Sequence, residues 1–173
     1  KNKEKKTILH YACESEDDEL IKYLIKFDID INAMDKEGKT ILHYLCKSGN
    51  IDIVKHISTI SEANFDIKDN YSRTILHEAC LYQNFELVKF LVESGKVDVR
   101  AKDKQGNTLL HESYDNLQML QYLVSLHKID VNAKDNYGLT ILLKAENNQS
   151  IVKYMASIPE VDITVQDSEG MNI

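Results

Sequence analysis

Apolar and polar residues follow a helical spacing along this chain, and the same grouping returns at a fixed interval. Leu20, Ile21 and Leu24 share one face of a helix that the pattern predicts from residue 18 to about residue 27. A similar apolar group, Ile53, Val54 and Ile57, follows about 33 residues later. The pattern therefore predicts short amphipathic helices repeated along the chain.

A four-residue motif precedes each of these predicted helices and marks the start of another. Its copies are Thr7-Ile8-Leu9-His10, Thr40-Ile41-Leu42-His43, Thr74-Ile75-Leu76-His77, Thr108-Leu109-Leu110-His111 and Thr140-Ile141-Leu142-Leu143. The steps between the threonines are 33, 34, 34 and 32 residues, and a fixed period of this size indicates a repeat array. Threonine is a good N-cap, so we expect a helix to begin at the residue after it.

The residues before each threonine have the chemistry of a turn. Aspartate lies five residues before the threonine at Asp35, Asp69, Asp103 and Asp135, and Asp167 begins the same turn in the sixth copy, whereas the first copy has Asn2 there. Glycine usually lies two residues before the threonine. Aspartate can bond nearby backbone N–H groups, and glycine accepts a positive φ. The third copy has Ser72 at the glycine position. A hairpin-like turn is therefore predicted before each first helix.

In these motifs the chain resembles ankyrin-repeat proteins, whose repeat consists of a β-turn, a helix, a tight turn and a second helix. The resemblance implies an all-α solenoid of stacked helix-turn-helix pairs joined by hairpin loops. We assign one domain over residues 1–173, with five repeats and the start of a sixth. The repeats are placed at about 2–34, 35–68, 69–102, 103–134 and 135–166, with 167–173 opening a truncated sixth.

Two departures from the family pattern bear on the structure. The proline that the family has after the threonine is isoleucine or leucine in every copy. The fourth and fifth repeats are shorter, since 15 residues separate Thr108 from Leu123 where 17 separate Thr40 from Ile57. We expect the two residues to be missing from the first helix or the turn after it. Because the sixth repeat stops at its hairpin, we also expect the chain to belong to a longer array.

Composition limits the classes of partner. The formal net charge is −7, which argues against nucleic acid, because a basic face supplies most of the affinity for a phosphate backbone. No stretch approaches 18 consecutive apolar residues, so direct insertion into a membrane is not expected. We expect a cytoplasmic monomer.

Three cysteines occupy the same position in successive repeats. Cys13, Cys46 and Cys80 each lie six residues after a threonine, so they should stack about 8–10 Å apart, too far for a disulfide. We expect free, buried thiols in a reducing compartment. Each forms a His-x-x-Cys pair, for which zinc binding is the alternative interpretation. A closed zinc site needs four converging ligands, whereas repetition supplies one pair per layer, so we expect no metal and no cofactor.

No motif indicates catalysis, since the chain has neither a phosphate-binding glycine loop nor a nucleophile elbow. The leading hypothesis is a non-catalytic scaffold that binds another protein. The alternative is a regulatory or targeting module within a longer enzyme or membrane-channel chain. By family resemblance, a partner lies on the concave face made by the hairpin tips and first helices. The expected contact residues are Lys36, Lys39, Tyr44, Lys47, Tyr71, Arg73, Tyr82, Lys104 and Tyr137.

Overall fold

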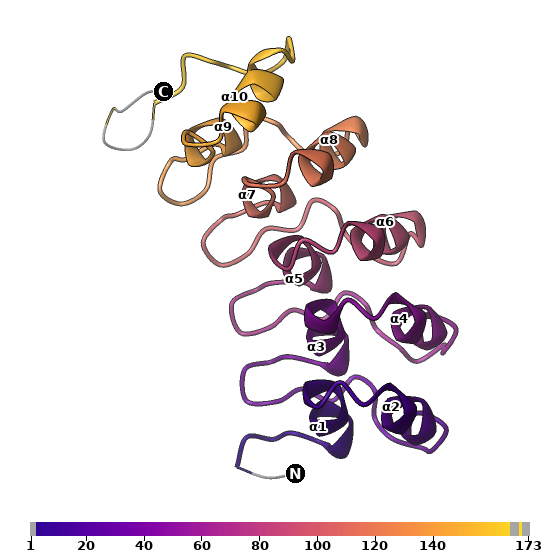
Figure 1. Ribbon diagram of the computed structural model, residues 1–173. Coiled ribbons are helices and arrows are strands. Elements are labelled where there is room, and N and C mark those ends of the chain that lie inside the picture. The colour runs from indigo at the N-terminus through magenta and orange to yellow at the C-terminus, as the bar shows by residue number, and fades with distance from the viewer. Residues whose placement is uncertain (1–2, 167–169, 171–173) are drawn as a thin grey trace. The chain divides into compact units, whose positions relative to one another are not determined.

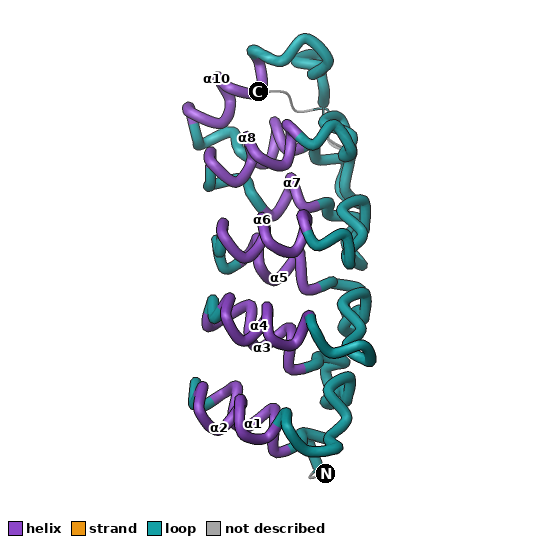
Figure 2. The backbone as a smooth tube through the Cα atoms, turned by 90° about the vertical axis from the view of Figure 1, so that its right-hand side faces the viewer, coloured by secondary structure: helices purple, strands orange, loops and turns teal. Residues whose placement is uncertain are grey.

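The structure is a computed structural model that describes residues 3–166 and 170. This part of the chain is all helical, with ten α-helices and no strand (Figures 1 and 2). The helices are α1 (Ile8–Glu14), α2 (Asp18–Leu24), α3 (Ile41–Ser48), α4 (Ile51–Ser58), α5 (Ile75–Leu81), α6 (Phe85–Glu93), α7 (Leu109–Glu112), α8 (Leu117–Ser125), α9 (Ile141–Lys144) and α10 (Gln149–Ala156). The prediction of an all-α fold is confirmed.

Each first helix packs against the second helix that follows it, which gives five antiparallel pairs. The chain divides into two compact units, Lys1–Val97 and Asp98–Ile173. In unit 1, the first helices α1, α3 and α5 form one layer and α2 packs beside α4 in a second layer, with the hairpin loops projecting from the first (Figure 1). In unit 2, α7 packs on α9 and α8 packs on α10. The assignment of one domain to the whole chain stays a prediction.

The motif histidine fixes the start of the first helix in the four repeats that have it. In α1 the backbone N–H of Thr7 donates to His10 Nδ1 at 3.1 Å, and in α3 the N–H of Thr40 donates to His43 Nδ1 at 3.2 Å. The other ring nitrogen, Nε2, lies 3.1 Å from the carbonyl oxygen of Lys39 for His10. A carbonyl only accepts, so Nε2 carries the proton and Nδ1 accepts. The prediction that the motif begins a helix is confirmed.

The hairpin loops are ordered by the predicted aspartates. Asp35 Oδ1 accepts from the backbone N–H groups of Glu37 and Lys39 at 2.8 and 2.9 Å. Consecutive hairpins also bond to each other, because the Asn70 N–H donates to the Glu37 carbonyl at 2.9 Å. Each loop is therefore held both by its own carboxylate and by its neighbour.

Glycine is needed where a hairpin turns back. Gly38 has φ +78°, and a Cβ there would lie 2.7 Å from Asn70 Oδ1 and 2.9 Å from the Asn70 backbone nitrogen. Ser72, at the same position of the next hairpin, has φ +59°, which is unfavourable for a residue with a side chain. The third hairpin thus keeps the turn at a cost in backbone strain.

The core consists of thin apolar layers between successive helix pairs. Ile41, Ile75 and Ile141 follow the motif threonine and are each 1% exposed, whereas Ile8 at the same position is 56% exposed. Full burial of such a side chain contributes about 1.5–3 kcal/mol. The helix pair that precedes a repeat normally covers this position, and Ile8 lacks that cover within the described residues.

The shortening of the fourth and fifth repeats falls in their first helices. Helices α7 and α9 have 4 residues each, against 7, 8 and 7 in α1, α3 and α5. This location agrees with the sequence prediction. Most of the predicted sixth repeat, 167–169 and 171–173, lies outside the described residues. No helix in the described part is long and apolar enough to cross a membrane.

Candidate functional site

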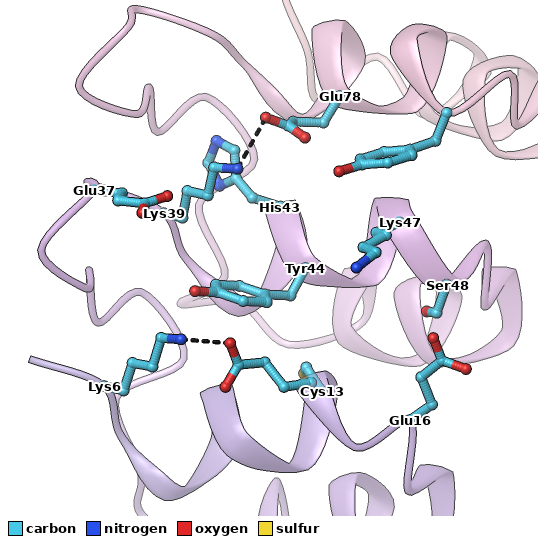
Figure 3. Close-up of a pocket in the computed structure, with 12 residues that line it drawn as sticks. Lys6, Cys13, Glu16, Glu37, Lys39, His43, Tyr44, Lys47, Ser48 and Glu78 are labelled. Atoms are coloured by element: carbon cyan, nitrogen blue, oxygen red, sulfur yellow. Dashed lines mark hydrogen bonds and ion pairs between the residues drawn. The ribbon is translucent and has the colours of Figure 1, made fainter. Parts of the chain in front are cut away.

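A pocket of about 370 Å³ opens on the face of unit 1 that carries the first helices (Figure 3). Helices α1, α3 and α5, the segment before α1 and the hairpin loop before α3 supply its walls, so it spans three successive repeats. We call it the Tyr44 pocket. It is lined by Lys6, Cys13, Glu14, Glu16, Glu37, Lys39, His43, Tyr44, Lys47, Ser48, Glu78 and Tyr82.

A hydrogen bond from Tyr44 to Asp35 holds the centre of the Tyr44 pocket in place. The hydroxyl of Tyr44 donates to Asp35 Oδ2 at 2.7 Å, so the ring is tied to the base of its own hairpin. Burial and this bond raise the pKa of Tyr44. Burial opposes ionisation of Asp35, but the bonds from Tyr44, Lys39 and Glu37 outweigh it and lower the pKa of that carboxyl. Tyr44 therefore stays a neutral donor, with one edge of its ring at the pocket.

A buried carboxylate closes one end of the pocket. Glu78 is 1% exposed, and its Oε1 lies 2.9 Å from Arg73 Nη2 and 3.4 Å from Lys39 Nζ. These ion pairs compensate its charge, although Oε1 accepts no hydrogen bond with good geometry from any described residue. Arg73 also binds Asp69 Oδ2 through Nε and Nη2, at 3.0 and 2.9 Å. Ion pairs to Glu78 thus connect the hairpins of the second and third repeats to α5.

The opposite end of the pocket carries a second ion pair, between Lys6 and Glu14 (Figure 3). The hydrogen bond to Glu14 raises the pKa of Lys6, so the lysine remains charged at neutral pH. Its ammonium group also lies 5.5 Å from the centre of the Tyr44 ring. The tyrosine ring is therefore already in contact with a cation, which is an arrangement that aromatic faces favour.

The structure brings together four of the nine expected contact residues in the Tyr44 pocket. Tyr44 and Tyr82 supply aromatic surface, while Lys39 and Lys47 supply positive charge. Lys47 is exposed, and Tyr82 is 40% exposed. These side chains are available to a partner.

The other expected residues lie outside this pocket. Lys36 pairs with Glu4, and Arg73 is held by Asp69 and Glu78 beneath the face. Tyr71 is 57% exposed, with the Arg73 guanidinium 5.4 Å from its ring centre. Lys104 and Tyr137 are exposed in unit 2. All nine remain proposed contacts.

Sequence reasoning did not assign Lys6, Glu14 or Glu78 to the site. Lys6 precedes α1 and Glu14 is the last residue of α1, so only the structure shows that the two side chains meet. Glu78 offered a signal, since it follows Thr74 by four residues as Tyr44 follows Thr40. Its repeat position places it on the first-helix face, but only the structure shows that it is buried between two cations.

The histidines and cysteines are occupied by structural contacts. Both ring nitrogens of His43 have partners, the N–H of Thr40 and the Arg73 carbonyl oxygen at 3.3 Å, which supports the local interpretation of the His-x-x-Cys pairs over the zinc site. Cys13, Cys46 and Cys80 form no disulfide and are buried, as predicted. Burial raises the pKa of Cys13 to about 12, so this thiol is a poor nucleophile at neutral pH. Among the described residues no three His, Cys, Asp or Glu side chains are grouped to hold a metal ion.

A family model described as ankyrin repeats in three copies matches the chain over residues 1–69, 46–135 and 97–167. Together these matches span nearly the whole sequence. The chain belongs to the ankyrin-repeat family. Ankyrin repeats generally mediate protein–protein interactions, and proteins built from them are typically non-catalytic scaffolds. No curated protein matches the chain. The family explains the stacked helix pairs, on which this ankyrin-repeat protein builds the Lys39–Glu78–Arg73 cluster and the Tyr44 pocket.

Proposed function

We propose that this protein is a non-catalytic scaffold whose first-helix face in unit 1 binds a partner protein. The observation that carries the proposal is the Tyr44 pocket, where two tyrosines and two lysines from the expected contact set converge. Tyrosine offers a large amphipathic surface at little entropic cost and is enriched at binding hot spots. By family resemblance this face is the concave one, which partners of ankyrin repeats use.

The pocket is suited to a protruding side chain of a partner. Its wall is polar and bears charges of both signs, with Lys47 free to pair and Glu16 and Glu37 at the rim. The outer tyrosine Tyr71 extends the contact area toward the hairpin tips. We therefore place the centre of the interface on the second and third repeats.

The test is affinity capture of partners from the cell of origin with the parent protein and with a Tyr71→Ala/Tyr82→Ala variant. Aromatic anchors cost about 2 kcal/mol or more when they are true hot spots, so recovery of the partner should fall at least tenfold. The melting temperature should change little, because both side chains are exposed. Tyr23→Ala is the matched control, since Tyr23 is 57% exposed on α2.

Equal recovery by the parent and the double variant would contradict this site. A loss of binding with Tyr23→Ala instead would indicate that the partner contacts the second helices. Binding that depends only on Lys104 and Tyr137 would assign the interface to unit 2.

A further inference from the structure

A second pocket, of about 340 Å³, lies in unit 2 on the loops that lead from the second helices to the hairpins. Its charged lining consists of Arg100 and Lys102 from the loop after α6, and Lys128, Asp130 and Lys134 from the loop after α8. Four of these five charges are positive, although the chain has a formal net charge of −7. We call this site the basic pocket.

The cations of the basic pocket differ from Lys6, Lys36 and Lys39 of unit 1, because no ion pair with a carboxylate is found for them among the described residues. In unit 1, Lys6, Lys36 and Lys39 each lie against a carboxylate. In the basic pocket, Arg100 Nε donates to the Lys128 carbonyl at 3.1 Å and Lys102 Nζ donates to the Lys134 carbonyl at 3.3 Å. These contacts use backbone oxygens, which carry no net charge.

The four cations therefore retain hydrogen-bond donors for a ligand. A guanidinium has five N–H donors and an ammonium has three, so Arg100 and Lys102 each use one and keep the others. Lys134 likewise spends one donor on the Gln166 carbonyl at 3.1 Å, and all four side chains belong to exposed residues. Charge-assisted bonds from such donors to carboxylates are about twice as strong as neutral ones.

The carboxylates near the pocket are turned toward their own loops. Asp130 Oδ1 accepts from the Asn132 N–H at 2.9 Å. Asp162 Oδ1 accepts from the backbone N–H and the hydroxyl of Thr164, at 2.8 and 2.7 Å. Those bonds, with the charge of Lys134 as a weaker influence, lower the pKa of Asp162. Among the described residues that line the basic pocket, four cations therefore face one carboxylate, that of Asp130.

We propose that the basic pocket binds an acidic segment of a partner protein. The cations come from two successive loops, which suits several carboxylates spaced along an extended chain. Alternate side chains of such a chain lie about 7 Å apart, and successive repeats are spaced by about 8–10 Å, so long glutamate side chains can reach both loops. A nucleic acid is disfavoured because the acidic remainder of the protein would repel its continuous phosphate backbone. This surface is separate from the Tyr44 pocket, and neither proposal depends on the other.

The probe is a fluorescein-labelled, acetylated hexaglutamate peptide, with hexaglutamine as the neutral peptide of equal length. Binding to the 173-residue chain is measured by fluorescence anisotropy at several salt concentrations, and the contact surface is mapped by amide chemical shifts. We expect hexaglutamate to bind at least tenfold more tightly than hexaglutamine. Its affinity should fall as salt rises, with shifts centred on the loops around Arg100 and Lys134.

Arg100→Gln/Lys128→Gln removes two charges from the basic pocket, and we expect at least a tenfold loss of hexaglutamate affinity. Lys89→Gln/Lys153→Gln removes two charges from exposed helical positions and should change the affinity less than threefold. Circular dichroism establishes that both variants fold. Equal losses in the two variants, equal affinity for hexaglutamine, or shifts centred on unit 1 would overturn the proposal. Displacement of the peptide by millimolar inorganic phosphate would overturn it too, because the site would then take a small anion.

Discussion

Ile8 and Ile41 occupy the same position of the repeat motif but differ in burial, at 56% and 1% exposed. Ile41→Ala removes buried methyl groups and leaves a cavity, so it should lower the free energy of unfolding by about 2–5 kcal/mol. Ile8→Ala removes atoms that are already partly in water and should cost less than about 1 kcal/mol. Urea unfolding of the two variants measures the difference. Equal losses would mean that Ile8 is covered in solution.

The motif histidines make stability depend on pH. Burial lowers the pKa of His43 to about 4, and it also lowers the pKa of His10 and His111 from the ordinary value of 6.5. The folded state thus favours the neutral imidazole. The stabilisation of the folded state by each histidine is therefore complete above pH 6.5 and is lost as the pH falls toward 4. For His43 alone the shift corresponds to a loss on the order of 3 kcal/mol.

The free energy of unfolding, measured in urea at pH 7, 6, 5 and 4.5, should therefore fall steadily through this window. His43→Gln should be less stable at pH 7 and should lose less on acidification than the parent. Stability that is unchanged between pH 7 and 5 would contradict the assignment. Carboxylates such as Asp35, whose pKa is lowered below 3.8, cease to stabilise the folded state only at more acidic pH.

At the scale of the structural element, the hairpins offer a matched pair of substitutions. Ser72→Gly removes the strain of a left-handed backbone, which costs about 1–2 kcal/mol in a residue with a side chain. The glycine also raises the chain entropy of the unfolded state, which destabilises the folded protein by about 0.4–1 kcal/mol. The net expectation is a gain of about 0.5–1 kcal/mol. Gly38→Ser should lose more than Ser72→Gly gains, because its Cβ would also meet the Asn70 backbone.

Thermal unfolding followed by circular dichroism distinguishes these outcomes. A destabilising Ser72→Gly would show that the serine side chain compensates for its backbone strain. A neutral Gly38→Ser would show that the second and third hairpins can move apart without loss.

The helix starts and turns of these elements could be predicted from the sequence because each depends on nearby residues. Threonine and histidine three residues apart cap a helix, and aspartate bonds N–H groups two and four residues ahead. The Glu78 cluster could not be predicted, since it depends on how far Lys39 reaches toward the next repeat and on which carboxylates Arg73 pairs with. For a related reason, the sequence could not predict that Arg100 and Lys134 bond to backbone carbonyls and not to carboxylates, because a sequence shows charges but not their partners.

At the scale of the molecule, all three cysteines lie in unit 1, so thiol labelling reports on that unit alone. We expect less than one thiol per chain to react quickly in the native protein, since all three are buried and burial raises the pKa of Cys13 to about 12. A disulfide reagent followed by absorbance gives the rate, and the unfolded chain in guanidinium gives the full count of three. Fast reaction of any one thiol in native conditions would show that its layer opens.

The bond from each motif histidine to the next hairpin has a consequence for how such arrays change over time. His10, His43 and His111 donate to the main-chain carbonyls of Lys39, Arg73 and Leu139, two cationic residues and one apolar residue. The acceptor is the backbone itself, so any hairpin of this shape can receive the bond whatever its side chain. A whole repeat can therefore be duplicated, deleted or exchanged between positions while this join is kept. The side chains at the hairpin tips remain free to vary with the partner.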